Sequence, residues 1–140
     1  MSDQQQPTYI DSEVLKALVE DKSKVPGKDY LVIDVRDDDR VGGHIPGSVN
    51  IPSKELPDRL PTLIGEYQHV PELFFHCALS QVRGPKAARR WSDALLASQG
   101  AYPQKINILR GGFGDWQRKY KDDKILVEAY EEEYWTEDYY

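Results

Sequence analysis

The sequence is poor in cysteine, in basic charge and in long apolar runs, and each shortage excludes a class of protein. It has one cysteine, Cys77, so no disulfide forms within the chain, which fits a reducing compartment. Lysine and arginine number 18 against 24 acidic residues, which does not favour a nucleic-acid partner. No apolar run approaches the ~20 residues of a membrane span. We therefore expect no nucleic-acid or membrane partner, and a protein of the cytoplasm, or also of the nucleus.

The 140 residues are enough for one ordinary domain. Residues 1–7 are polar and end in proline, which predicts a disordered lead-in. Residues 8–120 contain the apolar segments of a single core, and residues 1–120 together balance 16 acids with 16 bases. Residues 121–140 carry eight acids and two lysines. We expect this segment to be an acidic tyrosine-rich tail or a helix lying on the domain, since apolar side chains recur four apart at Leu126, Tyr130 and Tyr134.

Apolar segments alternate with amphipathic ones along the chain. Residues 30–34 form a continuous apolar run, typical of a parallel strand buried on both faces. Further strands are predicted at residues 8–10, 72–75 and 105–109. Helices are predicted after an N-cap at Asp11, between Ser53 as cap and Tyr67, from Lys86 to Ser98, and from Gly114 to Tyr120. This alternation predicts an α/β fold with a mainly parallel sheet.

The only cysteine lies between a predicted strand and a predicted helix. Five residues separate Cys77 from Arg83. A loop that runs onto a helix N-terminus points several backbone N–H groups into one concavity, where the helix dipole adds positive potential. Such a place favours a nucleophilic thiolate, and the planar fork of an arginine can hold two oxygens of a phosphate-like group. The segment predicts an oxyanion site around Cys77, with an inert buried thiol as the alternative.

The catalytic segment resembles a known signature. The run His76-Cys77-x-x-Ser80-x-x-Arg83-Gly84-Pro85 resembles the catalytic loop of the M-phase-inducer phosphatases, which, like related fungal arsenate reductases, are built on the rhodanese fold. Two more segments resemble the rhodanese signatures: Asp34-x-Arg36 followed by Gly43-His44-Ile45-x-Gly47, and Leu109-x-Gly111-Gly112-Phe113-x-x-Trp116. The resemblance covers about residues 10–120. It implies a rhodanese-like three-layer α/β domain in a small, single-domain fungal member of this group.

The resemblance implies hydrolysis of phosphomonoesters through a phosphocysteine on Cys77. Arg83 and the backbone N–H groups of the loop would stabilise the charge on the phosphoryl oxygens. The substrate would be a phosphorylated protein or small molecule. No cofactor and no metal is expected, because the three histidines and the cysteine show no ligand spacing. The residues expected to bind substrate are Ala78, Leu79, Ser80, Gln81 and Val82.

The sequence departs from the M-phase-inducer pattern at two loop positions. Ala78 and Val82 stand where that family has glutamates, and no Trp-Pro-Asp acid loop of the tyrosine phosphatases is visible. A leaving oxygen needs a proton or must leave well without one. The expected activity is therefore slow hydrolysis, better on phosphotyrosine and other aryl phosphates than on alkyl phosphates. The cell-cycle kinase specificity of the larger enzymes is not carried over.

Three other functions remain open. Arsenate reduction would use the same cradle and, with one cysteine, an external thiol such as glutathione or glutaredoxin. Thiosulfate sulfur transfer is the activity of ordinary rhodaneses, whose loops are typically one residue shorter than the one between Cys77 and Arg83. The wider cup favours phosphate or arsenate over a sulfane sulfur. A non-catalytic phosphate-binding module is the third.

Four polar residues beside the catalytic loop are candidates for a supporting role. Asp34 and Arg36 are either a pair that assists catalysis, with Asp34 as proton donor, or a structural salt bridge. His44 is either a base or a hydrogen-bonded loop anchor, and His76 directly precedes the cysteine. Nearby glycines, Gly43 and Gly47, suit positive φ or close packing against the catalytic loop. A further hypothesis folds residues 121–140 over the catalytic mouth as a screen.

Overall fold

The computed structural model describes residues 6–98 and 104–135. A five-stranded sheet forms its centre, in the order β1-β5-β4-β2-β3, and each pair of neighbouring strands is parallel. The predicted α/β class with a mainly parallel sheet is therefore confirmed. The strands are β1 (Thr8–Ile10), β2 (Leu31–Asp34), β3 (Val49–Asn50), β4 (Glu72–His76) and β5 (Lys105–Leu109).

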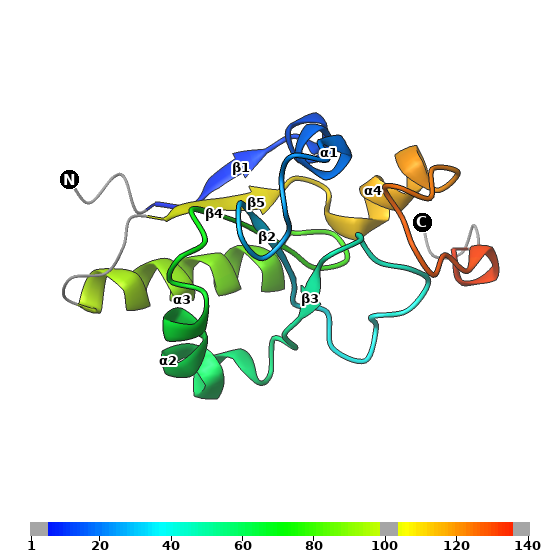
Figure 1. Ribbon diagram of the computed structural model, residues 1–140. Helices are drawn as coiled ribbons and strands as arrows, with labels where there is room; N and C mark the ends of the chain where they lie inside the picture. Colours follow the sequence, from blue (N-terminus) through cyan, green and yellow to red (C-terminus); the bar gives the residue numbers. More distant parts are fainter. Residues whose placement is uncertain (1–5, 99–103, 136–140) are drawn as a thin grey trace.

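Helices cover both faces of the sheet and complete three layers (Figure 1). One face carries α2 and α3, and the other carries α1 and α4. Among the described residues, no helix is long and apolar enough to cross a bilayer. The helices are α1 (Ser12–Glu20), α2 (Leu56–Glu66), α3 (Arg83–Ala97), α4 (Gly112–Tyr120) and the short 3-10 helix η2 (Glu132–Tyr134).

The central strand β4 supplies both cores. Its side chains alternate, so that Leu73 and Phe75 enter the core beneath α2 and α3 while Phe74 enters the core beneath α1 and α4. All three are fully buried, and burying each contributes about 1.5–3 kcal/mol. All of β2 is buried as well, as predicted from its continuous apolar run. The strands that lead to residues 77–82, here called the catalytic loop, are therefore packed on both faces.

Three helices begin at other residues than predicted: α4 begins at Gly112 rather than Gly114, and the other two have a proline in their first turn. α3 begins at Arg83 rather than Lys86, because Pro85 falls in the first turn, where its missing N–H leaves no intrahelical hydrogen bond unmade. α2 begins at Leu56 and has Pro57 as its second residue, and Ser53 is not its N-cap. Asp11 does hold the N-cap position of α1 but makes no side-chain cap hydrogen bond.

The last described segment, residues 126–135, is here called the C-terminal strap. It is not the helix predicted from apolar spacing, since only the three residues of η2 are helical there. Leu126, Val127 and Trp135 are buried in the core beneath α1 and α4. Trp135 Nε1 donates to the carbonyl of Gly42 at 2.8 Å, and His44 and Glu128 exchange two backbone hydrogen bonds of 3.0 Å each. The strap therefore holds the loop between β2 and β3.

The screening hypothesis for the tail finds no support in the strap itself, whose hydrogen bonds to Gly42 and His44 and whose buried side chains join it to that loop and to the core. Residues 136–140, 99–103 and 1–5 lie outside the described part of the chain. The predicted disordered lead-in and the predicted stop of α3 at Gly100 fall largely or wholly on those residues. The boundary at residue 120 stays a prediction, although apolar side chains beyond it belong to the core.

Candidate active site

The carboxyl ends of three neighbouring strands meet at one edge of the sheet. Asp34, the last residue of β2, lies in register with His76, the last residue of β4. β5 ends beside them at Leu109 and continues into the turn that starts α4. Parallel sheets bind ligands at this edge. Cys77, directly after β4, therefore lies where the topology favours a site.

The sulfur of Cys77 accepts two backbone N–H groups. Ser80 N lies 3.2 Å from Sγ and Gly84 N lies 3.3 Å from it. Gly84 is the second residue of α3, so the sulfur lies against a helix N-terminus. Ser80 reaches this position with a φ of 56°, a left-handed conformation unusual for a side-chain-bearing residue. The predicted concavity of N–H groups is present and faces the sulfur.

The residues expected to bind substrate divide into two sets. Ala78 and Ser80 are buried, whereas the side chains of Leu79, Gln81 and Val82 are exposed. The hydroxyl of Ser80 is buried and has no hydrogen-bond partner among the described residues. These five positions therefore offer an oxyanion chiefly their backbone N–H groups, as expected of a loop that binds an oxyanion with its backbone.

The turn between β5 and α4 supports the catalytic loop from beneath. Phe113 N donates to the Cys77 carbonyl at 3.0 Å, and Gly114 N donates to the Ala78 carbonyl at 2.8 Å. A Cβ on Gly112 would lie 2.5 Å from the Ala78 carbonyl oxygen, so only glycine fits. The two α4 N–H groups thus hold the backbone that carries the nucleophile.

Of the two reasons considered for Gly43 and Gly47, positive φ applies and close packing against the catalytic loop does not. A Cβ on Gly43 would meet Glu128 of the strap, and one on Gly47 would meet Pro26. Both glycines do have positive φ, as expected. The glycines that touch the loop come from the second signature, Gly112 and Gly114, because β5 rather than β3 is the other neighbour of β4.

Arg83 is the first residue of α3, and two carboxylates hold its guanidinium. Nη1 and Nη2 lie 2.8 and 2.6 Å from the two oxygens of Asp39, and Nη1 lies 3.2 Å from Asp37 Oδ2. The hydrogen bonds that Arg83 donates to Asp39 are the largest influence on the pKa of Arg83, which is raised. Arg83 is therefore in the predicted place, but its side chain is engaged with the loop after β2.

Sequence reasoning missed Asp37 and Asp39. In the sequence, these residues belong to a run of three aspartates in a polar loop. Only the order of the strands in the sheet places this run beside the catalytic loop. A usable signal existed: the acids follow a buried parallel strand, whose carboxyl end points to the ligand-binding edge. Ser53, predicted as a helix cap, instead donates its hydroxyl to Asp37 Oδ2 at 2.5 Å.

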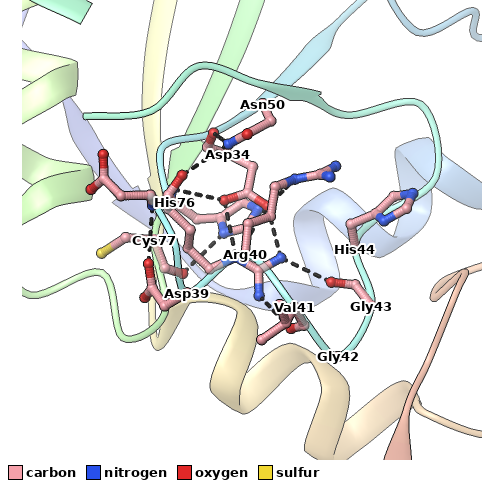
Figure 2. A network of polar contacts seen from close by, with 12 residues as sticks. Asp34, Asp39, Arg40, Val41, Gly42, Gly43, His44, Asn50, His76 and Cys77 are labelled. Carbon is pink, nitrogen blue, oxygen red and sulfur yellow. Dashed lines mark hydrogen bonds and ion pairs between the residues drawn. The ribbon is translucent and has the colours of Figure 1, made fainter. Parts of the chain in front are cut away.

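Asp34 and Arg36 form a fully buried ion pair. Figure 2 shows Asp34 within the surrounding network of polar contacts. Arg36 Nη2 lies 2.8 Å from Asp34 Oδ2, and it also donates to the carbonyl of Gly43 at 2.9 Å. Burial by itself would raise the pKa of Asp34, but the hydrogen bonds and the charge of Arg36 hold that pKa below its usual range. The salt bridge of the structural interpretation is present, and no hydrogen bond joins the pair to Cys77 or Arg83 among the described residues.

The two histidines near the loop lie in different environments. His76 is fully buried, and its Nδ1 lies 3.0 Å from the carbonyl of Cys77. Burial lowers the pKa of His76, so the ring is neutral at pH 7. His44 lies on the loop before β3, where its Nε2 is 2.9 Å from Glu128 Oε1 of the strap. The structure thus joins His76 to the catalytic loop and His44 to the strap.

A pocket of about 170 Å³ lies beside Arg83. Its apolar wall comes from Leu56, Pro57 and Val82, with Ala87 of α3. A cavity of about this volume accommodates a benzene ring. The basic side chains of Lys86 and Arg90 also line it. The site therefore offers an oxyanion cradle with a small apolar recess next to its arginine.

Comparison with known proteins agrees with this geometry. The family model of the rhodanese-like domain matches residues 11–119. The dual specificity phosphatase ibp1 of Schizosaccharomyces pombe is 34% identical over 137 residues, which cover 86% of this chain and 96% of that protein. Arsenate reductase 2.2 of Oryza sativa subsp. japonica is 40% identical over 88 residues, or 61% of this chain and 68% of that protein. The solved structure of Ygr203w, described as a yeast protein tyrosine phosphatase of the Rhodanese family, is 30% identical with a TM-score of 0.79 and covers 94% of this chain and 98% of that one.

These matches confirm the resemblance expected from the three motifs. The fold, the strand–loop–helix around Cys77 and the named relatives all agree. The chain belongs to the rhodanese-like family and, within it, to the group of cysteine-based phosphatases and arsenate reductases.

Proposed function

We propose that this protein is a cysteine-dependent phosphatase that hydrolyses aryl phosphomonoesters, phosphotyrosine among them. The observation that carries the proposal is the sulfur of Cys77, which lies at the N-terminus of α3 and accepts N–H groups from both Ser80 and Gly84. This geometry suits a thiolate that attacks phosphorus in line. The phosphatase names of two relatives support the proposal.

The reaction has two steps in this site. The Cys77 thiolate forms a bond to phosphorus while the bond from phosphorus to the leaving oxygen breaks, and the product is a phosphocysteine. Arg83 and the N–H groups of the loop stabilise the charge on the three non-bridging oxygens. Water then attacks phosphorus, releases inorganic phosphate and regenerates the thiolate. The apolar recess beside Arg83 would receive the aromatic ring of an aryl ester.

The test is hydrolysis of p-nitrophenyl phosphate by the purified protein, with vanadate as inhibitor. Cys77→Ser should abolish turnover, because the hydroxyl is not ionised at neutral pH. Arg83→Ala should lower kcat/KM by roughly 10²–10³-fold, the loss seen when one oxyanion donor is removed. Arg89→Ala removes the same charge from an exposed position of α3 and is the matched control. A wild type without vanadate-sensitive activity would overturn the proposal.

Arsenate reduction is the second candidate, supported by the identity to the rice arsenate reductase. Arsenate would enter the same cradle and react with Cys77 to form an arseno-thiol. Reduction to arsenite needs two electrons, and the chain has a single cysteine. External thiols of the glutathione or glutaredoxin class would supply both electrons and leave as a disulfide. Arsenite formation that requires both arsenate and glutathione, and that Cys77→Ser abolishes, would favour this activity.

Sulfur transfer and simple phosphate binding are the weaker alternatives. The five residues between Cys77 and Arg83 make a wider cup than the loop of ordinary rhodaneses. Transfer of sulfur from thiosulfate to cyanide by the wild type would contradict the phosphatase proposal. Vanadate binding without turnover of either ester or arsenate would instead favour a binding module.

A further inference from the structure

In the free protein, a carboxylate already occupies the arginine of the oxyanion cradle. The two terminal nitrogens of Arg83 each lie on one oxygen of Asp39, a bidentate arrangement. A phosphate or arsenate group takes an arginine fork in the same way. The edge formed by Nη1 and Nη2 cannot hold both groups at once, so an oxyanion that takes this edge must replace Asp39 on Arg83.

The two carboxylates on Arg83 are not equivalent. Asp37 has partners that do not depend on Arg83, because the Ser53 hydroxyl donates to it at 2.5 Å and the Lys54 N–H at 3.1 Å. Asp39 also accepts the backbone N–H of Asp37, at 3.0 Å, but its shortest contact is with Arg83. The Asp39 side chain is 30% exposed and that of Asp37 is 12% exposed. Asp39 is therefore the carboxylate free to exchange, and Asp37 is the fixed one.

Exchange changes the charge around Asp39. In the free protein the hydrogen bonds from Arg83 hold the pKa of Asp39 below its usual range, so the carboxyl is ionised. A bound dianion takes that cation away and adds negative charge nearby, and both changes favour the protonated carboxyl. The charged group that contacts Asp39 is Arg83 of α3, and Arg83 in turn contacts Asp37 and feels the charge of Cys77. Arg40, on the same loop as Asp39, pairs with Asp34.

Asp39 also lies close to the reacting atoms. A carboxyl group that contacts the guanidinium of Arg83 is one hydrogen-bond length from the atoms that hold the phosphoryl oxygens. Figure 2 shows the side chains of Asp39 and Cys77 at the same end of the polar network. Asp34, the proton donor considered from the sequence, is fully buried and is held by Arg36 instead.

We propose that Asp39 is the proton donor of this phosphatase and that the substrate frees it for this role by replacing it on Arg83. The proposal rests on the proposed function, since it needs a phosphorylated substrate and attack by Cys77. While the sulfur–phosphorus bond forms and the phosphorus–oxygen bond breaks, the carboxyl proton of Asp39 passes to the leaving oxygen. When water later attacks phosphorus, the Asp39 carboxylate accepts its proton and the sulfur–phosphorus bond breaks.

The exchange is tested by binding alone. Calorimetric titration with sulfate, in a Cys77→Ser background, avoids both turnover and titration of the thiol, and sulfate keeps its two charges between about pH 5 and pH 7.5. Asp39→Asn should bind sulfate several-fold more tightly, because no carboxylate competes for Arg83. At about pH 5, titrations in two buffers of different ionisation enthalpy should show proton uptake with Asp39 present and none with Asp39→Asn. Asp38→Asn, which removes the neighbouring exposed acid, is the control.

The donor role is tested by the leaving group. Asp39→Asn should lose more than tenfold in kcat on phenyl phosphate, whose leaving oxygen needs a proton, and much less on p-nitrophenyl phosphate. Equal losses on both esters would overturn the donor role, and an unchanged sulfate affinity would overturn the exchange. If the wild type hydrolyses neither ester, the proposed function fails together with the donor role. The sulfate titration still decides the exchange in that case.

Discussion

At the residue scale, Arg36 connects the end of β2 to the loop that carries the two carboxylates. Its guanidinium is fully buried, pairs with Asp34, and lies 4.5 Å from the centre of the Phe113 ring. It also donates to the carbonyls of Val41 and Gly43, at 3.2 and 2.9 Å. One side chain thereby closes the six residues between itself and Gly43 into a defined loop. Asp39 can meet Arg83 because this loop has one shape.

Removing one partner of this buried pair should destabilise the protein strongly. Asp34→Asn leaves the Arg36 charge buried without its carboxylate, which costs about 3–5 kcal/mol. The free energy of unfolding from urea titration measures the loss. Arg59→Met, which breaks the exposed pair with Glu55 in α2, is the control and should cost at most about 0.5 kcal/mol. Similar losses in the two variants would contradict a structural role for the buried pair.

At the element scale, the catalytic loop lies between two helix N-termini. α3 directs N–H groups toward the sulfur, and α4 directs two others to the carbonyls of Cys77 and Ala78. The loop backbone is therefore bonded on both sides, so the cradle exists before any substrate binds. This preorganisation depends on a close approach of Gly112 to the loop.

Gly112→Ala should damage the site more than the fold. The added Cβ would lie 2.5 Å from the Ala78 carbonyl oxygen and push the loop away from α4, and the φ of 60° adds backbone strain. We expect sulfate affinity and kcat/KM on p-nitrophenyl phosphate to fall at least tenfold. Gly27→Ala has a similar φ of 90° but open space around it. This control should cost about 1–2 kcal/mol of stability with activity unchanged, and equal activity in the two variants would refute the close-approach argument.

At the scale of the whole molecule, ionisable groups with lowered pKa values gather at one edge of the sheet. Burial acts to raise the pKa values of Asp34 and Asp37, but their hydrogen bonds and nearby cations lower these pKa values overall. The pKa of Asp39 is lowered chiefly by the hydrogen bonds that it accepts from Arg83. Burial lowers the pKa of His76. The strap completes this arrangement, because it fixes the far end of the loop that carries the acids. At neutral pH the acids of this edge are therefore ionised and His76 is neutral.

These pKa directions predict acid sensitivity. The folded protein binds fewer protons than the unfolded chain at each of the four groups, so stability is complete above the unfolded pKa values and falls with decreasing pH. The decline should begin near pH 6.5 with His76 and steepen below about pH 4 as the acids protonate. The His76 contribution is at most about 1.4 kcal/mol per pH unit. Urea midpoints at about pH 7.5, 6.5, 5.5 and 4 measure it.

The His76 contribution can be separated from that of the acids. A His76→Asn variant should lose the slope between about pH 6.5 and pH 5.5 and keep the steep decline below pH 4. His69→Gln, which removes an exposed imidazole, should keep both parts of the curve. A flat curve for the wild type between pH 7.5 and 5.5 would show that His76 does not titrate differently in the two states.

Local patterns in the sequence determined the fold and the centre of the site. Apolar runs marked the strands, and the catalytic motif between β4 and α3 placed Cys77 and Arg83 correctly, because strand, loop and helix are neighbours in the chain. The three motifs were also sufficient for the family, because each depends on residues a few positions apart.

The partners of those residues were decided by tertiary structure alone. Asp39 meets Arg83 across 44 residues and Trp135 meets Gly42 across 93, and no local spacing encodes contacts of that separation. The sheet order also decided which glycines touch the catalytic loop, since β5 and β2, not β3, are the neighbours of β4. Cys77 and the N–H groups on its sulfur are thus local properties of the chain. The pairing of Asp39 with Arg83 exists only because two strands end side by side.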